Sequence, residues 1–297
     1  MMSDTLFTAF LDNSITNATG RFAALLGLSP SKGARSPALW NAAFAAAGAD
    51  AVMHPFDVSE ANLPGLVATL KADPRYIGGS VAVPHKQALV ALLDRLEPEA
   101  ERIGAVNAIY RDGTELVGAN TDGAGALEQL RGMVDDLGGR HALLLGLGGA
   151  GLAVAAYLAG NVASLRLADR SLGKAQAFAE RLGGNVRGVE LPKSSSDLRG
   201  VKLIINCTSV GHQDGDQASS LGDNSEPLLD AMPDDTVIYD IIYQPAETEL
   251  LRQAKVIGLT TLNGLGMNLD QAVIAFEKAN PSLLTTDEIR DAMQSAG

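Results

Sequence analysis

The sequence contains one cysteine, Cys207, so the chain cannot form an internal disulfide, and we expect a reducing, cytoplasmic setting. No apolar stretch reaches the length of a membrane-spanning helix, and residues 1–17 lack the basic start of a secretory signal. Basic residues are few: 23 Lys and Arg stand against 35 Asp and Glu, a formal net charge of -12, and no basic run occurs. This balance argues against nucleic-acid and membrane partners, but a locally basic pocket for a small anionic substrate is compatible with it.

The remaining composition is that of a packed globular protein. The 297 residues suffice for two ordinary domains or one large one, and 46% of them are hydrophobic. The 32 glycines favour an α/β protein with many tight turns between strands and helices. We predict no metal site, because the spacing typical of metal ligands is absent among the four histidines, His54, His85, His141 and His212.

The first part of the chain alternates short apolar runs with helical segments. The pattern predicts strands at 22–26, 51–58 and 77–83, and helices at 38–47, 63–71 and from Lys86 to about 93. A further short helix is expected around residues 6–11. Asp112 and Gly113, between the apolar segments 106–110 and 115–117, predict a hairpin, so this part should form a mixed sheet.

From residue 142 the pattern becomes a regular alternation of strand and helix. Strands are predicted at 142–145, 164–168, 203–206 and 237–242, with helices at 148–159 and 172–182. Such alternation is typical of a doubly wound parallel sheet. The polar segment 211–227 predicts a loop, 269–278 a helix, and 285–288 the capping box of a last helix. The change of pattern places a domain switch near residues 120–122, before a helix that reaches about residue 133.

Gly146, Gly148 and Gly151 form a Gly-x-Gly-x-x-Gly motif that follows an apolar strand and opens a helix. In a Rossmann domain these glycines permit the tight turn, the close approach of the pyrophosphate, and the packing of helix on strand. The helix N-terminus, which includes Gly149 and Ala150, presents N–H groups to the phosphates. A glycine-rich turn without a ligand is the alternative, but the strand and helix around the motif favour a bound nicotinamide dinucleotide.

The next predicted strand ends at Asp169, where an acidic residue accepts hydrogen bonds from the ribose hydroxyls of NAD and repels a 2′-phosphate. Arg170 and Lys174 are residues that attract such a phosphate. NAD is therefore favoured, and NADP stays open. Asp169 also suits the N-cap of the following helix, which is compatible with binding.

The chain from about residue 21 onward resembles the shikimate/quinate dehydrogenase family in a series of motifs that follow the family's order. These are Ser36-Pro37 after Gly27-x-x-Pro30, the segments 81–86, 104–107, 120–123 and 206–211, the motif Tyr239-Asp240-x-x-Tyr243-x-Pro245, and the segment 264–271. Each motif alone is weak, but together they are specific.

The resemblance implies a substrate-binding α/β domain with a mixed sheet, formed by residues 1–121 and 264–297. An NAD(P)-binding Rossmann domain over residues 122–263 would be inserted into it, with the substrate in the cleft between the two. The implied reaction is reversible hydride transfer between the nicotinamide and a ring hydroxyl of shikimate, quinate or a related cyclic hydroxy acid, as in aromatic amino acid biosynthesis.

The resemblance also implies roles for individual residues. Lys86 and Asp122 would be the catalytic pair. The substrate would be held by four residues, Ser36, Asn107, Tyr243 and Gln271. The cofactor site would comprise the glycine loop with Asp169 and Arg170, together with three further residues, Thr208, Gly264 and Met267.

Acid–base chemistry gives independent support for the pair Lys86 and Asp122. Oxidising a secondary alcohol requires removal of the hydroxyl proton as the hydride departs. A lysine at a helix N-terminus lies at the positive end of the helix dipole, which lowers its pKa toward the range of a general base. A neighbouring carboxylate acts in the opposite direction and orients the ammonium group, so the two would titrate as a coupled pair.

Each of these residues also has a purely structural interpretation. Taken alone, Lys86 is typical of a solvated helix start and Asp122 of an N-cap. Asn107 also suits the satisfaction of backbone groups at a strand end, Tyr243 a half-buried core position, and Gln271 a surface position.

Two further residues near these motifs have chemistry of their own. Cys207 is interpreted as a small buried hydrophobe rather than a nucleophile. His85 adjoins Lys86, and we expect it to titrate near the site.

Three positions depart from the family pattern in the predicted substrate pocket. Ala34 and Ala82 stand where the family has a serine and a threonine, and Ser80 where it has an asparagine. Leaving a buried polar group unpaired costs about 1–3 kcal/mol, so such losses weaken the binding of a polar substrate. We therefore predict a paralogue with an altered pocket and weakened activity on shikimate or quinate, in which Arg35 or Lys32 supplies replacement contacts.

Two other functions compete with this one. A catalytically idle dinucleotide-binding sensor would need no proton relay, so Lys86 and Asp122 argue against it. A dehydrogenase of a substrate unlike shikimate is the other, and the motifs around Tyr243 and Gln271 argue against that. In either case we expect a small-molecule ligand and a monomer or homodimer.

Overall fold

The computed structural model describes residues 9–15 and 20–296 and divides the chain into two compact units. Unit 1 consists of Met1–Thr121 and Leu269–Gly297, and unit 2 of Asp122–Asn268. The return to unit 1 lies after residue 268, whereas the sequence placed it after 263, because helix α10 (Leu265–Ala279) continues across the boundary and its first turn groups with unit 2. Of the short helix expected around residues 6–11, residues 6–8 lie outside the described residues, and residues 9 and 10 form a turn.

Unit 1 is built on a mixed sheet of six strands in the order β2-β1-β3-β5-β6-β4. The strands are β1 (Arg21–Gly27), β2 (Ala51–Asp57), β3 (Tyr76–Val81), β4 (Arg95–Leu96), β5 (Ala108–Asp112) and β6 (Glu115–Ala119). Strand β1 runs parallel to both β2 and β3, whereas β5 runs antiparallel to β3 and β6. The predicted mixed sheet and its β5–β6 hairpin are therefore confirmed.

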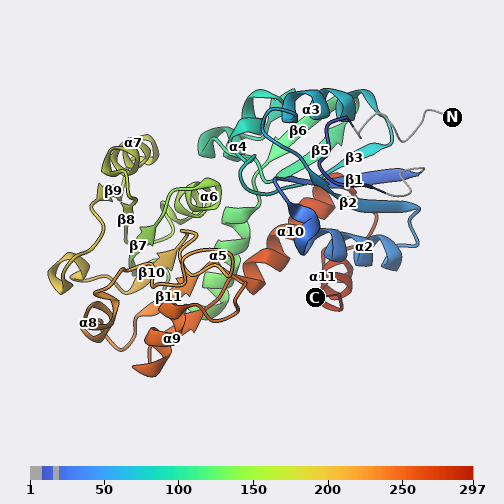
Figure 1. Ribbon diagram of the computed structural model, residues 1–297. Coiled ribbons are helices and arrows are strands. Elements are labelled where there is room, and N and C mark those ends of the chain that lie inside the picture. The colour runs from blue at the N-terminus through green and yellow to red at the C-terminus, as the bar shows by residue number, and fades with distance from the viewer. Residues whose placement is uncertain (1–8, 16–19, 297) are drawn as a thin grey trace. The chain divides into compact units, whose positions relative to one another are not determined.

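Helices cover both faces of this sheet. Helix α3 (Leu63–Ala72) lies on one face, and α2 (Ser36–Ala46) lies on the other (Figure 1). Strand side chains alternate between faces with a period of two. In β1, Phe22 and Leu26 accordingly belong to the core on the α3 side, and Ala23 and Leu25 to the core on the α2 side. Because both faces are covered, polar side chains can gather at the ends of the strands rather than on the faces of the sheet.

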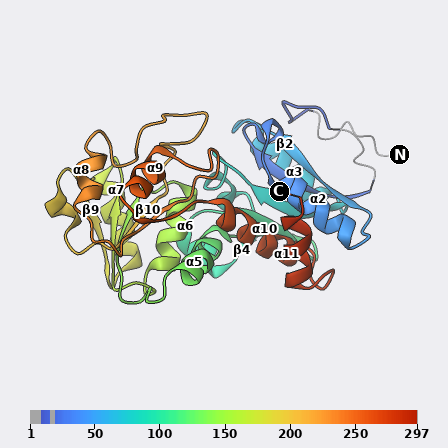
Figure 2. The ribbon, with the colours of Figure 1, turned by 90° about the horizontal axis from the view of Figure 1, so that it is seen from below.

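The core on the α2 side joins the two sequence segments of unit 1. Trp40 of α2 packs edge-on against Phe276 of α10, with ring centroids 5.2 Å apart. Helix α11 (Thr286–Gln294) adds Ile289 to the same core, and Figure 2 shows α2, α10 and α11 together. The predicted capping box between Thr285 and Glu288 is confirmed.

The segment around Lys86 differs from the predicted helix. Residues 83–87 form a turn, and a short three-ten helix, η2 (Ala88–Ala91), follows. The carbonyl of Lys86 accepts the Val106 N–H at 2.7 Å, so it is not available for a helical bond. Beyond it, Val90 donates to Gln87 three residues back, as in a three-ten helix. The prediction that Lys86 stands at the N-terminus of a helix reaching about residue 93 is therefore wrong.

Unit 2 contains a fully parallel sheet in the order β12-β11-β10-β7-β8-β9, the arrangement of a doubly wound dinucleotide-binding domain. Its strands are β7 (His141–Leu145), β8 (Ser164–Ala168), β9 (Val186–Val189), β10 (Leu203–Asn206), β11 (Val237–Asp240) and β12 (Thr260–Leu262). Its helices are α5 (Asp122–Met133), α6 (Gly149–Leu158), α7 (Leu172–Leu182), α8 (Ser225–Asp230) and α9 (Glu249–Val256). The predicted Rossmann fold is confirmed.

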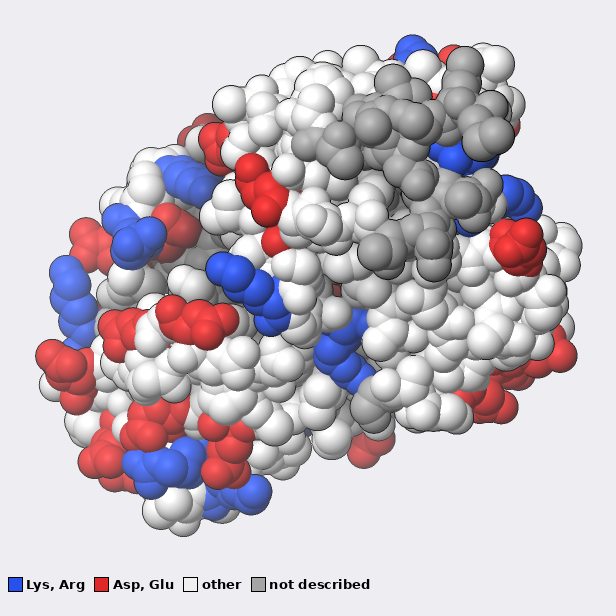
Figure 3. All heavy atoms as spheres, turned by 45° about the vertical axis from the view of Figure 1, so that its right-hand side comes forward, with Lys and Arg blue, Asp and Glu red and all other residues white. Residues whose placement is uncertain are grey.

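The surface carries both signs of charge. On the face drawn in Figure 3, Lys and Arg side chains are interspersed with Asp and Glu. Within residues 9–15 and 20–296, no helix combines the length and the apolar character needed to cross a bilayer.

Candidate active site

The glycine motif of unit 2 forms the turn between β7 and α6. Gly146 has φ +88°, a left-handed conformation that favours glycine. A Cβ on Gly151 would lie 2.0 Å from the Gly146 carbonyl oxygen, so the helix can pack here only without a side chain. A Cβ on Gly148, the N-cap of α6, would meet no atom within 4 Å. The N-terminus of α6 is thus open to a phosphate group at Gly148.

This turn lies at the topological switch point of the parallel sheet. Strand β7 has β10 on one side and β8 on the other, and ligands of such sheets bind where the connections diverge. Thr208 follows β10 at the same edge. A Cβ on Gly146 would lie 2.7 Å from the Cγ2 atom of Thr208, so the two loops touch.

A buried polar network fixes the loop that carries Thr208. The Asn206 Oδ1 atom accepts hydrogen bonds from the Thr208 N–H and hydroxyl at 3.0 and 2.7 Å. Asn206 in turn donates to Asp240 at 3.0 Å, and Asp240 accepts the Thr248 hydroxyl at 2.7 Å. Burial raises the pKa of the Asp240 carboxyl, against the hydrogen bonds donated by Thr248, the Ile242 N–H and Asn206.

Asp169 lies directly after β8 and binds the glycine loop through the backbone. Its carboxylate accepts the Leu147 N–H at 2.9 Å and the Ser171 N–H at 3.0 Å. Burial acts to raise its pKa, but these backbone hydrogen bonds and the nearby charges of Lys174 and Arg170 outweigh burial, so the pKa lies below its ordinary value. The group is therefore an anion at neutral pH. The N-cap of α7 is Ser171 rather than Asp169.

The other predicted residues of unit 2 lie in separate elements. Asp122 is the first residue of α5 and is buried. Tyr243 is half-buried beyond β11. Gly264 packs on the backbone of Ile241, where a Cβ would lie 1.9 Å from the carbonyl oxygen, and Met267 is buried in the first turn of α10.

In unit 1, the predicted residues follow the carboxyl ends of the strands. Ser36 opens α2 after the loop that leaves β1, and Lys86 lies half-buried in the turn after β3. Because β1 and β3 are parallel, both segments leave the same edge of the sheet.

Asn107, Thr121 and Gln271 form a buried hydrogen-bonded cluster. The Asn107 amide donates to the Thr121 hydroxyl at 2.9 Å and to the Gln271 Oε1 atom at 3.2 Å, and it accepts the Thr121 N–H at 2.7 Å. The Thr121 hydroxyl donates to the Gln271 carbonyl at 2.9 Å. Gln271 is 7% exposed, so its interpretation as a surface glutamine is wrong.

Thr121 was not singled out from the sequence, although it lies inside the 120–123 motif. Its role depends on a partner 150 residues away in the chain, Gln271. A threonine directly before a helix is ordinarily interpreted as an N-cap, so the sequence around Thr121 did not indicate its bond to Gln271.

Two residues with reactive side chains, His85 and Cys207, are buried in the core. The ring of His85 is fully buried, and its Nε2 atom lies 2.7 Å from the Val58 carbonyl oxygen. Burial raises the pKa of the Cys207 thiol, with the negative charges of Asp240 and Asp122 adding to the effect. Cys207 is therefore a protonated, buried side chain, as the sequence indicated.

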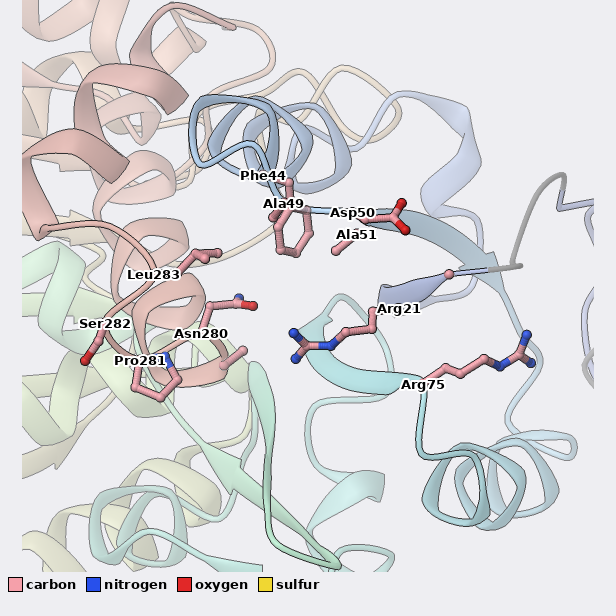
Figure 4. Close-up of a pocket in the computed structure, with 12 residues that line it drawn as sticks. Arg21, Phe44, Ala49, Asp50, Ala51, Arg75, Asn280, Pro281, Ser282 and Leu283 are labelled. Atoms are coloured by element: carbon pink, nitrogen blue, oxygen red, sulfur yellow. The ribbon is translucent and has the colours of Figure 1, made fainter.

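A separate pocket of about 770 Å³ lies at the opposite edge of the sheet of unit 1. The lining includes residues from the start of β1, the start of β2 and the end of α10. Figure 4 shows that the Arg21 side chain points into the pocket and the Arg75 side chain away from it. None of the predicted site residues lines it. Among the described residues, no cluster of three or more His, Cys, Asp and Glu side chains suits a metal ion.

The open space at Gly148 gives a direct test of the dinucleotide site. We expect Gly148→Ala to fold normally, because φ is -66° and no atom lies within 4 Å, but to weaken NAD(P) binding by tenfold or more, because the methyl group occupies the path of the phosphates. Gly173→Ala in α7 is the matched control, since its Cβ also meets nothing within 4 Å. Calorimetric titration with NAD and NADP measures both; equal affinity in the two variants would contradict the assignment.

Comparison with known proteins agrees with this geometry. Residues 28–109 match the model of the shikimate dehydrogenase substrate binding domain. A shikimate dehydrogenase (NADP(+)) of Symbiobacterium thermophilum is 38% identical over 272 residues, 89% of this chain and 90% of the relative. A protein of the same description from a Geobacter species is 41% identical, covering 81% of this chain and 83% of the relative.

Solved structures show the same likeness over the whole fold. A shikimate dehydrogenase in complex with NADP+ superposes with a TM-score of 0.83 at 31% identity, covering 95% of this chain and 97% of that one. A quinate dehydrogenase from Corynebacterium glutamicum in complex with NAD has a TM-score of 0.79 at 28% identity, covering 93% and 99%.

Sequence likeness along nearly the whole chain, a Rossmann unit with an open glycine loop, and a second unit that matches the family's substrate-binding domain all agree. The chain belongs to the shikimate dehydrogenase family and is an oxidoreductase that uses a nicotinamide dinucleotide.

Proposed function

We propose that this protein catalyses reversible hydride transfer between NAD(P) and a ring hydroxyl of shikimate, quinate or a closely related cyclic hydroxy acid. The observation that carries the proposal is that a chain 38% identical to a shikimate dehydrogenase over most of its length has both members of the proposed catalytic pair, Lys86 and Asp122. An idle sensor would need neither, so the enzyme is favoured over the sensor.

A nicotinamide dinucleotide held at the glycine loop and Asp169 would supply the acceptor for the hydride that leaves the carbon bearing the hydroxyl. Lys86 takes the hydroxyl proton through its Nζ atom in the same step and returns it when the ketone is reduced. Asp122 would orient the ammonium group of Lys86 through its carboxylate. Lys86 itself stands in a turn rather than at a helix start.

Substrate hydroxyls and the carboxylate would be held by Ser36, Tyr243 and Gln271. Asn107 has a different part, because its amide already bonds to Thr121 and Gln271. The Gln271 Oε1 atom accepts a hydrogen bond from Asn107, and this bond fixes the orientation of the Gln271 side-chain amide, whose Nε2 group is a donor. We therefore assign Asn107 to orienting Gln271 as well as to the substrate site.

The altered pocket remains part of the proposal. Ala34 and Ala82 pack against the hydrophobic core of unit 1, and neither offers a hydrogen bond to a polar substrate. We propose weaker turnover of shikimate and quinate than in an enzyme with hydroxyl groups at these positions. We also propose a cytoplasmic monomer or homodimer.

For the cofactor we propose a preference for NAD, on the strength of the Asp169 anion. A carboxylate at this position accepts both ribose hydroxyls and repels a 2′-phosphate. The relatives named for NADP(+) and the positive charges of Arg170 and Lys174 favour the other cofactor, so NADP should be used as well, less efficiently.

The catalytic proposal is tested by oxidation of shikimate and quinate with NAD and NADP, followed by the absorbance of the reduced cofactor. We expect Lys86→Ala to lower kcat by about 100-fold or more, because a positioned acid–base group contributes roughly that much, while the cofactor Kd stays unchanged. Lys71→Ala, a surface lysine of unit 1 paired with Asp94, is the control. A wild-type protein that oxidises neither compound would contradict the proposed substrate class, and one that oxidises no alcohol in a broad panel would favour the sensor.

The cofactor proposal is tested by Asp169→Asn, which removes the negative charge and leaves one acceptor oxygen for the two backbone N–H groups of Leu147 and Ser171. We expect the ratio of kcat/KM for NADP to that for NAD to rise by tenfold or more, because the repulsion of the 2′-phosphate is lost. Arg170→Ala should move the ratio the other way. An unchanged ratio in the Asp169 variant would show that this carboxylate does not select the cofactor.

A further inference from the structure

The loop that leads to Ser36 has little packing of its own. Residues 28–35 connect β1 to α2, and Pro30 is the buried member of an otherwise exposed or half-exposed stretch. Inside the loop, Lys32 donates to Ser29 at 3.1 Å and Ala34 to Pro30 at 3.2 Å. A segment with few buried contacts opens easily, so its position depends on bonds from outside.

Asp57 supplies such bonds from the end of β2. Its side chain is 7% exposed and accepts the Ser31 N–H at 2.9 Å and the Ser31 hydroxyl through its second oxygen. Hydrogen bonds to a carboxylate are stronger than those between neutral groups, and two of them to one residue fix its orientation. The carboxylate therefore attaches the middle of the loop to the sheet.

The residue after Asp57 makes equivalent bonds to the neighbouring segments. Val58 donates its N–H to the Gly27 carbonyl at 2.8 Å, and its own carbonyl accepts the ring nitrogen of His85 at 2.7 Å. His85 directly precedes Lys86. The end of β2 thus contacts both the loop that leads to Ser36 and the turn that carries Lys86.

A segment before β1 holds Asp57 from the other side. Strand β2 is an edge strand, so its outward backbone groups need partners. Asp12 donates its N–H to the Asp57 carbonyl at 2.8 Å, the Asn13 Oδ1 atom accepts the Asp57 N–H at 2.9 Å, and Asn13 donates to the Pro55 carbonyl at 2.9 Å. Phe10 packs on α3, where a Cβ on Gly65 would lie 2.3 Å from its ring.

We propose that Asp57 is a positioning residue that sets the loop 28–35 through Ser31, and that Asn13 holds Asp57 in place from the outer side of β2. Asp57 does not touch the substrate in this account. It acts on substrate affinity through the placement of Ser36, so this part of the inference rests on the proposed function.

The test compares Asp57→Ala with Asp73→Ala. Asp73 is a matched control: it lies in the same unit, is 9% exposed, and accepts hydrogen bonds from Arg75 instead of from the loop. We expect both variants to lower Tm. We expect only Asp57→Ala to raise the KM for shikimate, by about tenfold, with kcat changed less than threefold and the cofactor Kd unchanged.

Conservative variants distinguish a positioning role of Asp57 from a general loss of stability. Asp57→Asn keeps an acceptor for the Ser31 N–H and should restore most of the affinity. Ser31→Thr should behave as wild type, and Ser31→Ala added to Asp57→Ala should have no further effect. Asn13→Ala should raise KM in the same direction, whereas Asn62→Ala, which bonds to Phe10 at 3.4 Å and not to Asp57, should not.

Hydrogen exchange of residues 28–35 without any ligand gives a readout that is independent of the substrate. Asp57→Ala should accelerate exchange in this loop, and Asp73→Ala should not. The proposal is overturned if the two variants behave alike in loop exchange and in KM, or if Asp57→Ala leaves both unchanged. If the wild type oxidises neither shikimate nor quinate, the proposed function fails, and the exchange measurement alone decides on Asp57.

Discussion

The hydrogen-bonded cluster of Asn107, Thr121 and Gln271 is the constraint on which the organisation of this chain depends. Thr121 is the last residue before the chain enters unit 2, and Gln271 follows closely on its return. The Thr121 hydroxyl donates to the Gln271 carbonyl, and Asn107 bonds to both. Buried polar groups of this kind must be satisfied, so the cluster holds the outgoing and returning segments together and lets a whole Rossmann unit be inserted without disrupting the sheet.

Hydrogen bonds from side chains also hold loops at the carboxyl ends of other strands. In unit 2, Asn206 and Asp240 hold the loop of Thr208, and Asp169 holds the glycine loop through Leu147. In unit 1, Asp57 holds the loop before Ser36. In each case a side chain at a strand end accepts backbone or hydroxyl hydrogens of a loop, which places the residues assigned to ligand binding on rigid supports.

Local pattern was sufficient for much of this structure. Strand β1 and the strand before Gly146 follow from short, uninterrupted apolar runs, and the glycines at 146 and 151 follow from the steric needs of the turn. Strand β9 was not predicted because Arg187 and Gly188 interrupt its apolar run, and β12 was not predicted because it has only three residues. The turn at Lys86 was not predicted, because the Lys86 carbonyl accepts a hydrogen bond from Val106 and the local sequence does not reveal this bond. The roles of Thr121 and Asp57 were not predicted for the same reason. Their hydrogen-bond partners are distant in the chain, and no rule for caps or turns indicates them.

We propose that unit 2 binds the dinucleotide at the glycine loop and that unit 1 binds the cyclic hydroxy acid beside Ser36 and Lys86. Hydrogen exchange of the wild-type protein, first with NAD or NADP and then with shikimate added, tests both assignments. We expect the cofactor to slow exchange in residues 146–151 and 169–174, and shikimate then to slow exchange in residues 28–36 and 82–90. Unchanged exchange in the unit 1 segments on addition of shikimate, or in the glycine loop on addition of cofactor, would contradict the corresponding assignment.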